Sequence, residues 1–319
     1  MIKKDFKTLN EQLDILRDKN LIITDEEYTK NVLLRENYFF INGYRHLFVK
    51  NNDREFLPGV RFEELYSLFL FDRSLRNIIF KYLLVIENNL KSITSYVLSR
   101  KYGYREKDYL KSKNFSNRPD KQKQINDLLN KMKRQIKING SQHSATLHYS
   151  SKYGYIPLWI LVKVLSFGIV SELYSILKKE DQEEIANIYN VDVNELLDYL
   201  PILANYRNLC AHEDILYENK TQKYIDNTIY HKLLEIPKNE ADEYICGKND
   251  LYALIIILRQ LLSKDDFKNL IFEVENTIET LNYNLLSIKI QKVLDRMGFP
   301  ENWKDIVNIE RKKENEEGK

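Results

Sequence analysis

The chain has 319 residues, enough for one large domain or for two of ordinary size. Only nine residues are Gly and six are Pro, so the turn formers that β-sandwiches, β-barrels and glycine-dependent nucleotide-binding sheets need are scarce, and a mostly helical fold is expected. Hydrophobic residues make up 43% of the chain and charged residues 30%, which excludes a disordered chain, while a net charge of +2 neither favours nor excludes a nucleic-acid partner.

Periodic apolar residues predict helices through the first hundred residues. Three leucines between 9 and 16 are spaced by four and three residues, which indicates a first amphipathic helix. Thr24 followed by Glu27 matches a capping box and predicts that a second helix begins there. The aromatic run at 38–48 predicts a bent helix or a helix-turn with its rings in the core. From 62 to 101 the apolar residues keep a period near 3.6, which predicts one long helix or two in line.

The second half continues the helical pattern. The expected segments are a helix at about 121–138, a helix after Pro157, a helix through 170–177, a short helix at about 181–190, a helix capped by Asp192, and two or three helices between 250 and 297. Pro201 has no amide proton, so we expect it to start a new helix or to kink the one that Asp192 begins. Residues 220–249 show no clear period and are expected to form a long insert.

These elements predict an all-α protein, a helical bundle with N-terminal and C-terminal helical extensions. The expected parts are an N-terminal helical segment at 1–60, a helical core at 61–240, and a C-terminal helical extension at 241–319 that ends in a charged tail. A basic insert at about 100–140 interrupts the core.

The positive charge of the chain is concentrated in this insert. Residues 100–140 hold thirteen Lys or Arg residues and four Asp or Glu residues, a local net charge of +9, whereas 180–200 holds no Lys or Arg. Such cations bind backbone phosphates, and aromatic residues among them offer faces on which unpaired bases stack. The candidate RNA-binding residues are Arg105, Lys111, Lys113, Arg118, Lys121, Lys123, Lys133 and Arg134, and the accompanying aromatic residues are Tyr102, Tyr104, Tyr109 and Phe115. The alternative is a solvated, mobile helix-loop-helix without a ligand, because lysine-rich exposed helices are common.

The chemical signal lies at 206–212, where the sequence reads Tyr-Arg-Asn-Leu-Cys-Ala-His after an apolar helical ladder. At about 100° per residue, Asn208 and His212 lie one turn apart on the same face of a helix, with Arg207 beside them. A guanidinium, a carboxamide and an imidazole are then within reach of one small anion. RNA cleavage without a metal needs such groups, because a base of near-neutral pKa takes the 2′-hydroxyl proton and a cation stabilises the charge that builds on the phosphate.

The same residues also have a purely structural interpretation. Arg207 would then be a surface salt-bridge residue, and His212 would interact with the dipole at the C-terminal end of its helix. An arginine and a histidine at this spacing occur by chance about once in a chain of this size, so spacing alone favours the structural interpretation.

Beyond spacing, the sequence resembles a known family. Arg-Asn-x-x-x-His at the end of an apolar helix resembles the motif of HEPN-type ribonucleases, and the whole pattern is similar to the Abi-like (AbiD/AbiF-type) abortive-infection family. The blocks that carry the resemblance are YFFINGYRHLF at 38–48, FLFDRSLRNIIF at 69–80, IENNLKS at 86–92, LSFGIVSELY at 165–174, YRNLCAH at 206–212 and MGFPENW at 297–303. Any one block is unspecific, whereas all six in order are specific and cover nearly the whole chain.

The resemblance implies a HEPN-like helical bundle in which Arg207 and His212 are the catalytic pair and Asn208 is the polar residue that follows the arginine. It also places Glu87 on an earlier helix, from which its carboxylate would orient the arginine, while an ordinary surface glutamate is the alternative. Relatives carry further basic or histidine residues just after the motif. This chain has two acidic residues at 213–214 instead, so a second phosphate-binding residue is missing there.

Other chemistries find little support in the sequence. The two cysteines, Cys210 and Cys246, provide neither a disulfide framework nor a zinc site, and Cys210 is expected to pack in the core. No motif for a metal or a cofactor occurs, so neither is expected. Neither a secretory signal nor an apolar run of membrane-spanning length is present, so we expect a cytoplasmic protein without a membrane partner.

Two function classes follow. The resemblance implies a metal-independent endoribonuclease toxin of phage defence or of a toxin-antitoxin system, which leaves 2′,3′-cyclic phosphate ends and is restrained by an antitoxin, with a non-coding RNA as one candidate. A non-catalytic RNA-binding regulatory protein that uses the basic insert is the alternative. Cleavage needs an acid as well as a base, so we expect a homodimer whose composite site holds motif residues of both chains.

Overall fold

The computed structural model describes residues 5–50, 55–139 and 142–310. Within these ranges the regular structure is helical and β-structure is limited to isolated bridges, which confirms the predicted all-α class. The α-helices are α1 (Leu9–Asp18), α2 (Glu26–Glu36), α3 (Tyr38–Gly43), α4 (Phe62–Tyr102), α5 (Glu106–Tyr109), α6 (Gln122–Asn139), α7 (Ser144–Tyr153), α8 (Leu158–Val164), α9 (Phe167–Ser175), α10 (Lys179–Ile188), α11 (Val193–Ala211), α12 (Ile229–Leu233), α13 (Leu251–Leu261), α14 (Lys264–Asn284) and α15 (Ile290–Met297). Short 3₁₀ helices are η1 (Tyr44–Leu47), η2 (Ser112–Asn114), η3 (Pro119–Lys121) and η4 (Trp303–Asn308). Residues 311–319 of the expected charged tail lie outside the described residues.

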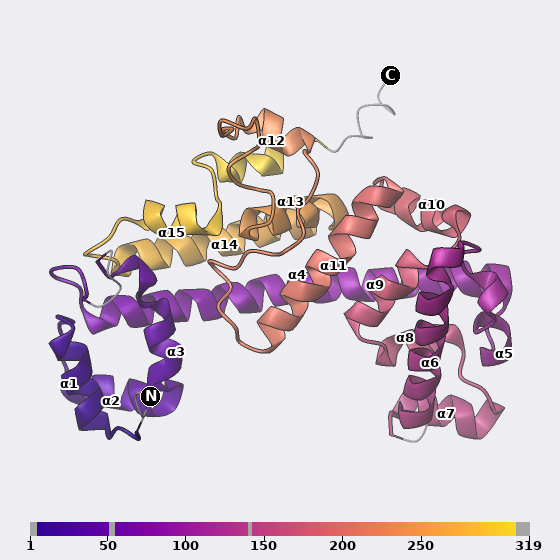
Figure 1. Cartoon of the computed structure of the whole chain (residues 1–319), viewed down its shortest axis with the longest axis horizontal. Coiled ribbons are helices and arrows are strands. Elements are labelled where there is room, and N and C mark those ends of the chain that lie inside the picture. The colour runs from indigo at the N-terminus through magenta and orange to yellow at the C-terminus, as the bar shows by residue number, and fades with distance from the viewer. Residues whose placement is uncertain (1–4, 51–54, 140–141, 311–319) are drawn as a thin grey trace.

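Helix α4 is the spine of the molecule. Its 41 residues extend over roughly 60 Å at 1.5 Å per residue. Helix α14 lies along it, α11 crosses it, and α8 and α9 pack against it (Figure 1). The periodic segment at 62–101 is therefore a single helix, and it ends at Tyr102 because Gly103 leaves the helical conformation with a φ of 93°.

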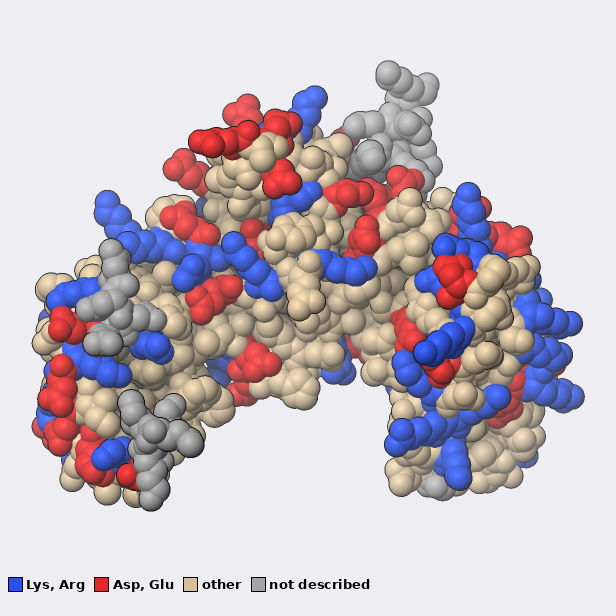
Figure 2. Space-filling view, viewed as in Figure 1, with Lys and Arg blue, Asp and Glu red and all other residues tan. Residues whose placement is uncertain are grey.

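Two groups of helices lie at the two ends of α4. Helices α1, α2 and α3 gather near its N-terminal end, and α5, α6, α7 and α8 near its C-terminal end (Figure 1). The space-filling view shows a hollow between these two groups, with the middle part of the molecule above it (Figure 2). The chain thus forms an arch with two legs.

Helix α11 carries the 206–211 part of the motif. Asp192 caps its first turn through a capping box with Glu195, as the sequence predicts. Pro201 lies inside this one helix rather than at the start of a new one.

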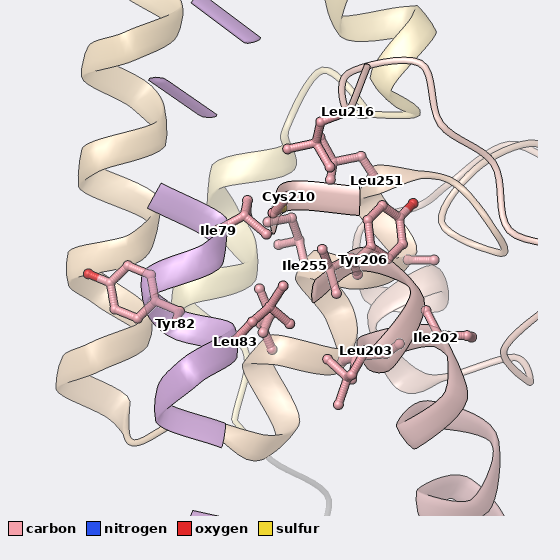
Figure 3. Packing of buried hydrophobic residues seen from close by; sticks show 14 of the residues in the cluster. Ile79, Tyr82, Leu83, Ile202, Leu203, Tyr206, Cys210, Leu216, Leu251 and Ile255 are labelled. Carbon is pink, nitrogen blue, oxygen red and sulfur yellow. The ribbon is translucent and has the colours of Figure 1, made fainter. Parts of the chain in front are cut away.

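The inner face of α11 packs into the core. Figure 3 shows this contact, which involves Leu203, Tyr206 and Cys210 of α11, Ile79 and Leu83 of α4, and Leu251 and Ile255 of α13. The burial of Cys210 agrees with the expectation that it packs in the core, and burial raises the pKa of its thiol to about 12. The thiol therefore stays protonated at neutral pH and is a poor nucleophile.

Two local predictions in the N-terminal leg are wrong. Asp25 caps α2, since its carboxylate accepts a hydrogen bond from the amide of Tyr28 at 2.9 Å, whereas the hydroxyl of Thr24 donates to Glu63 of α4. Thr24 and Glu27 match a capping box in sequence, but the hydroxyl of Thr24 makes a tertiary contact with α4 instead of capping α2.

The second error concerns the aromatic run at 38–48. Tyr44 is buried as expected, but Phe39 and Phe40 are exposed, and Phe40 has 56% of its surface open to solvent. Helix α3 is short and presents one side to solvent, so aromatic character alone does not identify its core face.

A buried carboxylate joins three distant parts of the chain. Asp72 of α4 forms an ion pair with Arg76 and accepts a hydrogen bond from the hydroxyl of Tyr44 at 2.7 Å. It also accepts from the backbone amides of residues 216 and 217, at 3.1 and 2.7 Å. Arg76 donates in turn to the carbonyl oxygen of Asp214 at 3.3 Å. The segment that follows the motif is therefore fixed to α4 and to the N-terminal leg.

This cluster predicts a large effect of one substitution on stability. Asp72→Ala removes the carboxylate that neutralises the buried Arg76 guanidinium and leaves two backbone amides without their acceptor, and it should lower the free energy of unfolding by about 3–5 kcal/mol. Urea denaturation followed by circular dichroism measures this loss. The matched control is Asp120→Ala, which removes an exposed partner of Arg118 and should change stability by less than about 0.5 kcal/mol. Equal small losses in both variants would contradict the proposed importance of Asp72.

Candidate functional site

The motif lies at the C-terminal end of α11, where the helix stops. Ala211 is the last helical residue, and the backbone amide of His212 caps the helix by donating to the carbonyl oxygen of Asn208 at 3.0 Å. Glu213 then adopts a positive φ of 57°, and the amide of Asp214 donates back to the carbonyl oxygen of Leu209 at 3.2 Å. The chain turns sharply here, so the side chain of His212 stands at an exposed corner.

Asn208 and His212 share this exposed end of the helix. Neither side chain makes a hydrogen bond or ion pair within the described ranges, and both are open to solvent. The structure thus places a free carboxamide and a free imidazole one turn apart, as the sequence predicts.

Arg207 points to the flank of α11 that faces α4. Its Nε donates to the Oε2 of Glu87 at 3.2 Å, and its guanidinium lies 5.7 Å from the ring centroid of Phe80. The other carboxylate oxygen of Glu87 accepts from the Nζ of Lys91 at 2.7 Å. Glu87 is only 4% exposed, so it is a buried partner of two cations and not an ordinary surface residue.

This arrangement leaves one edge of the guanidinium available. In the part of the chain that the structure describes, the Nη groups of Arg207 make no hydrogen bond, and its side chain is 30% exposed. A guanidinium held through Nε can donate from its Nη atoms to phosphate oxygens. The buried carboxylate therefore orients the cation while the free edge stays open to a ligand.

A pocket of about 570 Å³ opens beside His212. The residues that line it come from the N-terminal leg, α4 and the end of α11, and they are Arg35, Glu36, Phe40, Tyr44, Phe69, Arg73, Ala211, His212, Glu213 and Ile215. A volume of this size is within the range of small-molecule sites. His212 therefore lines this pocket, whereas Arg207 and Asn208 are not among its lining residues.

Two arginines of this pocket were not found by the sequence reasoning. Arg73 forms a two-bond contact with Glu36, at 3.0 and 2.6 Å, and lies 4.5 Å from the ring centroid of Phe69. The same guanidinium lowers the pKa of Glu36 below its ordinary value, so this pair is charged at neutral pH. Arg35 is exposed and has no hydrogen bond or salt bridge among the described residues. Arg73 lies within the block at 69–80 that carries the family resemblance, whereas no pattern in the sequence around Arg35 indicates a site.

The candidate RNA-binding residues lie in the other leg, away from this pocket (Figure 1). All of them are at least partly exposed. Several have internal partners, since Arg118 pairs with Asp120, Lys111 with Asp108 at 3.5 Å, and Lys121 with the amide oxygen of Gln124 at 3.0 Å. No ion pair within the described ranges involves Lys113, Lys123, Lys133 or Arg134.

The aromatic residues of this region are less available than expected. Tyr109 and Phe115 are buried, so they cannot stack on a base, and Tyr102 is half-buried with its hydroxyl donating to Asp181 at 2.7 Å. Tyr104 alone of the four predicted aromatic residues is exposed.

Within the described ranges, no three His, Cys, Asp or Glu side chains gather in a group that would hold a metal ion. In the same part of the chain, no helix combines the length and the apolar character that crossing a membrane requires.

Comparison with known protein families identifies a relationship. The family model described as Abi-like protein matches residues 31–218. These residues include the pocket, the whole of α4 and the motif at the end of α11. No curated protein and no solved structure matches the chain.

The contact between Glu87 and Arg207 predicts measurable coupling. A double-mutant cycle of Glu87→Gln and Arg207→Gln should give an interaction energy of about 1 kcal/mol in unfolding experiments, because each single change removes the same charged hydrogen bond. A parallel cycle on the exposed pair Lys179 and Glu183 serves as control and should give less than about 0.5 kcal/mol. A value near zero for Glu87 and Arg207 would show that the carboxylate does not hold the arginine.

Proposed function

The chain belongs to the Abi-like protein family, and on that premise we propose that it is a metal-independent endoribonuclease toxin that acts in abortive infection, a form of phage defence. The observation that carries the proposal is the end of α11, which presents an imidazole and a carboxamide to solvent and also carries a guanidinium that a buried carboxylate orients. This set of groups supplies a base, a hydrogen-bonding amide and a fixed cation without any metal ligand.

The proposed reaction is an internal transesterification of RNA. His212 takes the proton of a 2′-hydroxyl group, and the 2′-oxygen forms a bond to the adjacent phosphorus. Arg207 donates from its Nη groups to the phosphate oxygens, on which negative charge builds in the transition state. The bond from phosphorus to the 5′-oxygen then breaks, and an acid protonates the leaving oxygen. The products are a 2′,3′-cyclic phosphate and a 5′-hydroxyl end.

Arg35 would compensate for the acidic residues that follow the motif. It comes from α2, lines the same pocket as His212 and has no salt bridge among the described residues. A guanidinium in that position can hold a phosphate next to the scissile one. On this proposal the second phosphate-binding residue is supplied by the N-terminal leg rather than by the residues after His212.

A second copy of the chain would supply the missing acid. One His212 cannot accept the 2′-proton and protonate the leaving oxygen in the same step, whereas two histidines that meet across a two-fold axis can. Phe39 and Phe40 support this part of the proposal, because they are exposed, contact each other at 6.0 Å between ring centroids, and Phe40 borders the His212 pocket. Exposed aromatic side chains of this kind are common at protein interfaces. The proposed assembly is a homodimer with Arg207, Asn208 and His212 from both chains at one site.

The alternative function is RNA binding without cleavage. The exposed, unpaired cations of the basic insert favour it, because they suit the phosphate backbone of any RNA. The same surface would also suit a structured non-coding RNA that acts as the antitoxin. His212 distinguishes the two functions, because the enzyme needs this residue and the binding protein does not.

The catalytic proposal predicts that His212→Ala and Arg207→Ala each abolish toxicity, with Asn208→Ala in between. Both main changes should leave the helical circular-dichroism signal nearly intact, because His212 is exposed and Arg207 is partly exposed. The matched control is His143→Ala, which removes another exposed histidine, just before α7 in the other leg, and should keep full toxicity. Toxicity that survives in the His212 and Arg207 variants would favour the binding protein.

The dimer proposal predicts a dominant effect in mixtures. An excess of His212→Ala protein added to wild type should depress activity more steeply than dilution alone, because mixed dimers have an incomplete site. Light scattering at micromolar concentration should show a dimer. A monomer with full activity would exclude the composite site while leaving the assignment of Arg207 and His212 intact.

A further inference from the structure

Six aromatic side chains form a continuous row on the leg that carries the basic insert. In order they are Trp159, Tyr104, Tyr155, Tyr153, Tyr149 and His148, and successive ring centroids lie 5.6, 5.7, 6.3, 5.4 and 5.6 Å apart. Contacts of this length are ordinary for aromatic pairs, but aromatic pairs normally occur in a core. We call these six residues the aromatic row.

Three segments of the chain build this row and hold it in place. Tyr104 follows α4, Tyr155 lies between α7 and α8, and the remaining residues lie on α7 and α8. The backbone amide of Leu158 donates to the carbonyl oxygen of Tyr104 at 3.2 Å, which joins the start of α8 to the segment that follows α4. The hydroxyl of the buried Tyr109 donates to the carbonyl oxygen of Ile156 at 2.9 Å. The row is therefore supported by backbone contacts beneath it.

The aromatic row is open to solvent. Trp159 is 43% exposed and Tyr153 is 48% exposed, Tyr104 and His148 are exposed as well, and Tyr149 and Tyr155 are half-buried. An exposed cluster of large rings is unfavourable in water unless it binds something. The row therefore needs a ligand or a partner.

The cations beside the aromatic row favour an anionic ligand. The guanidinium of Arg105 lies 4.9 Å from the ring centroid of Tyr155 and 5.7 Å from that of Tyr104, and the ammonium of Lys152 lies 5.5 Å from that of Tyr153. The acidic groups nearby are already engaged, since the carboxylate of Glu106 accepts from the amide of Ile156 and Asp108 pairs with Lys111. Cations are thus stacked among the rings, and the carboxylates of Glu106 and Asp108 are already paired.

We propose that the aromatic row binds an unpaired stretch of the RNA substrate by stacking its bases. Rings and arginine side chains provide flat faces for bases, and cations beside them bind the connecting phosphates. Bases in a duplex have no free face, so the row selects single-stranded RNA. The choice of RNA as the ligand rests on the proposed function, whereas the preference for unpaired bases rests on the row itself.

The two tryptophans of the chain make this binding directly measurable. Trp159 is in the row, while Trp303 is only 4% exposed and remote from solvent. The probes are a single-stranded oligouridylate and an RNA duplex of equal length, added to full-length His212→Ala protein so that no cleavage occurs. Stacking on Trp159 should quench its fluorescence with the single strand and much less with the duplex.

Variants separate stacking from general attraction. Tyr104→Ala combined with Tyr155→Ala should weaken binding of the single strand about five- to tenfold, measured by anisotropy of a labelled oligonucleotide. Trp159→Phe should abolish the quenching and keep the affinity within about twofold, because a ring remains. The matched control is Tyr283→Ala, which removes a highly exposed tyrosine on α14 and should change nothing.

Three outcomes would overturn the proposal. They are equal binding of single strand and duplex, unchanged affinity in the Tyr104 and Tyr155 double variant, or loss of dimer formation in that variant with normal RNA binding, which would assign the row to a protein contact. Cleavage that still depends on His212 in any of these cases would leave the ribonuclease proposal standing. Loss of both cleavage by wild type and quenching would remove both proposals together.

Discussion

The position of the motif depends on one buried carboxylate. Asp72 binds the backbone just after His212, the hydroxyl of Tyr44 and the guanidinium of Arg76. These bonds join the turn that follows α11 to α4, and this turn sets where His212 lies relative to the pocket. Three separate sequence blocks, at 38–48, 69–80 and 206–212, are therefore parts of a single structural unit. The first two blocks supply Tyr44, Asp72 and Arg76 to this cluster, and the third block leads directly into the backbone of 214–217 that completes it.

A second buried carboxylate has the same role for Arg207. Glu87 lies four turns further along α4 than Asp72, and its carboxylate accepts a hydrogen bond from the Nε of Arg207. Two acidic residues on one rigid helix thus determine where α11 can lie and how its cation points. A long helix is suited to this task, because it fixes the spacing between its side chains.

The sequence predicted the helices better than the contacts between them. The long helix at 62–101 and the capping of α11 by Asp192 follow from local patterns, and both are present. The pairing of Arg100 and Lys101 with the acidic residues of α10 joins positions about 80 apart, and periodicity carries no information at that separation. The errors at Thr24 and Phe40 have the same origin, because each residue was assigned from its neighbours in sequence. Likewise, the pairing of Glu87 with Arg207 was only one of two readings, and Arg35 had no local signal.

These long-range pairs also neutralise part of the positive charge of the basic insert. Its first cations are neutralised by α10, and Lys131 pairs with Glu172 of α9. Among the described residues, the cations without an ion pair include Lys113 of η2, Lys123, Lys133 and Arg134 of α6, and the cations beside the aromatic row. The leg of the arch that carries them faces the other leg across the hollow (Figure 2). An RNA strand held by this leg would approach the motif from the open side of the molecule.

The most direct test of the central claim is the chemistry of the RNA ends. Purified protein is incubated with total RNA in the presence of EDTA, and the new ends are analysed. The account predicts 2′,3′-cyclic phosphate and 5′-hydroxyl ends that form with wild type and not with His212→Ala. RNA that shifts in a gel but stays intact, or ends that form equally with the His212→Ala protein, would contradict it.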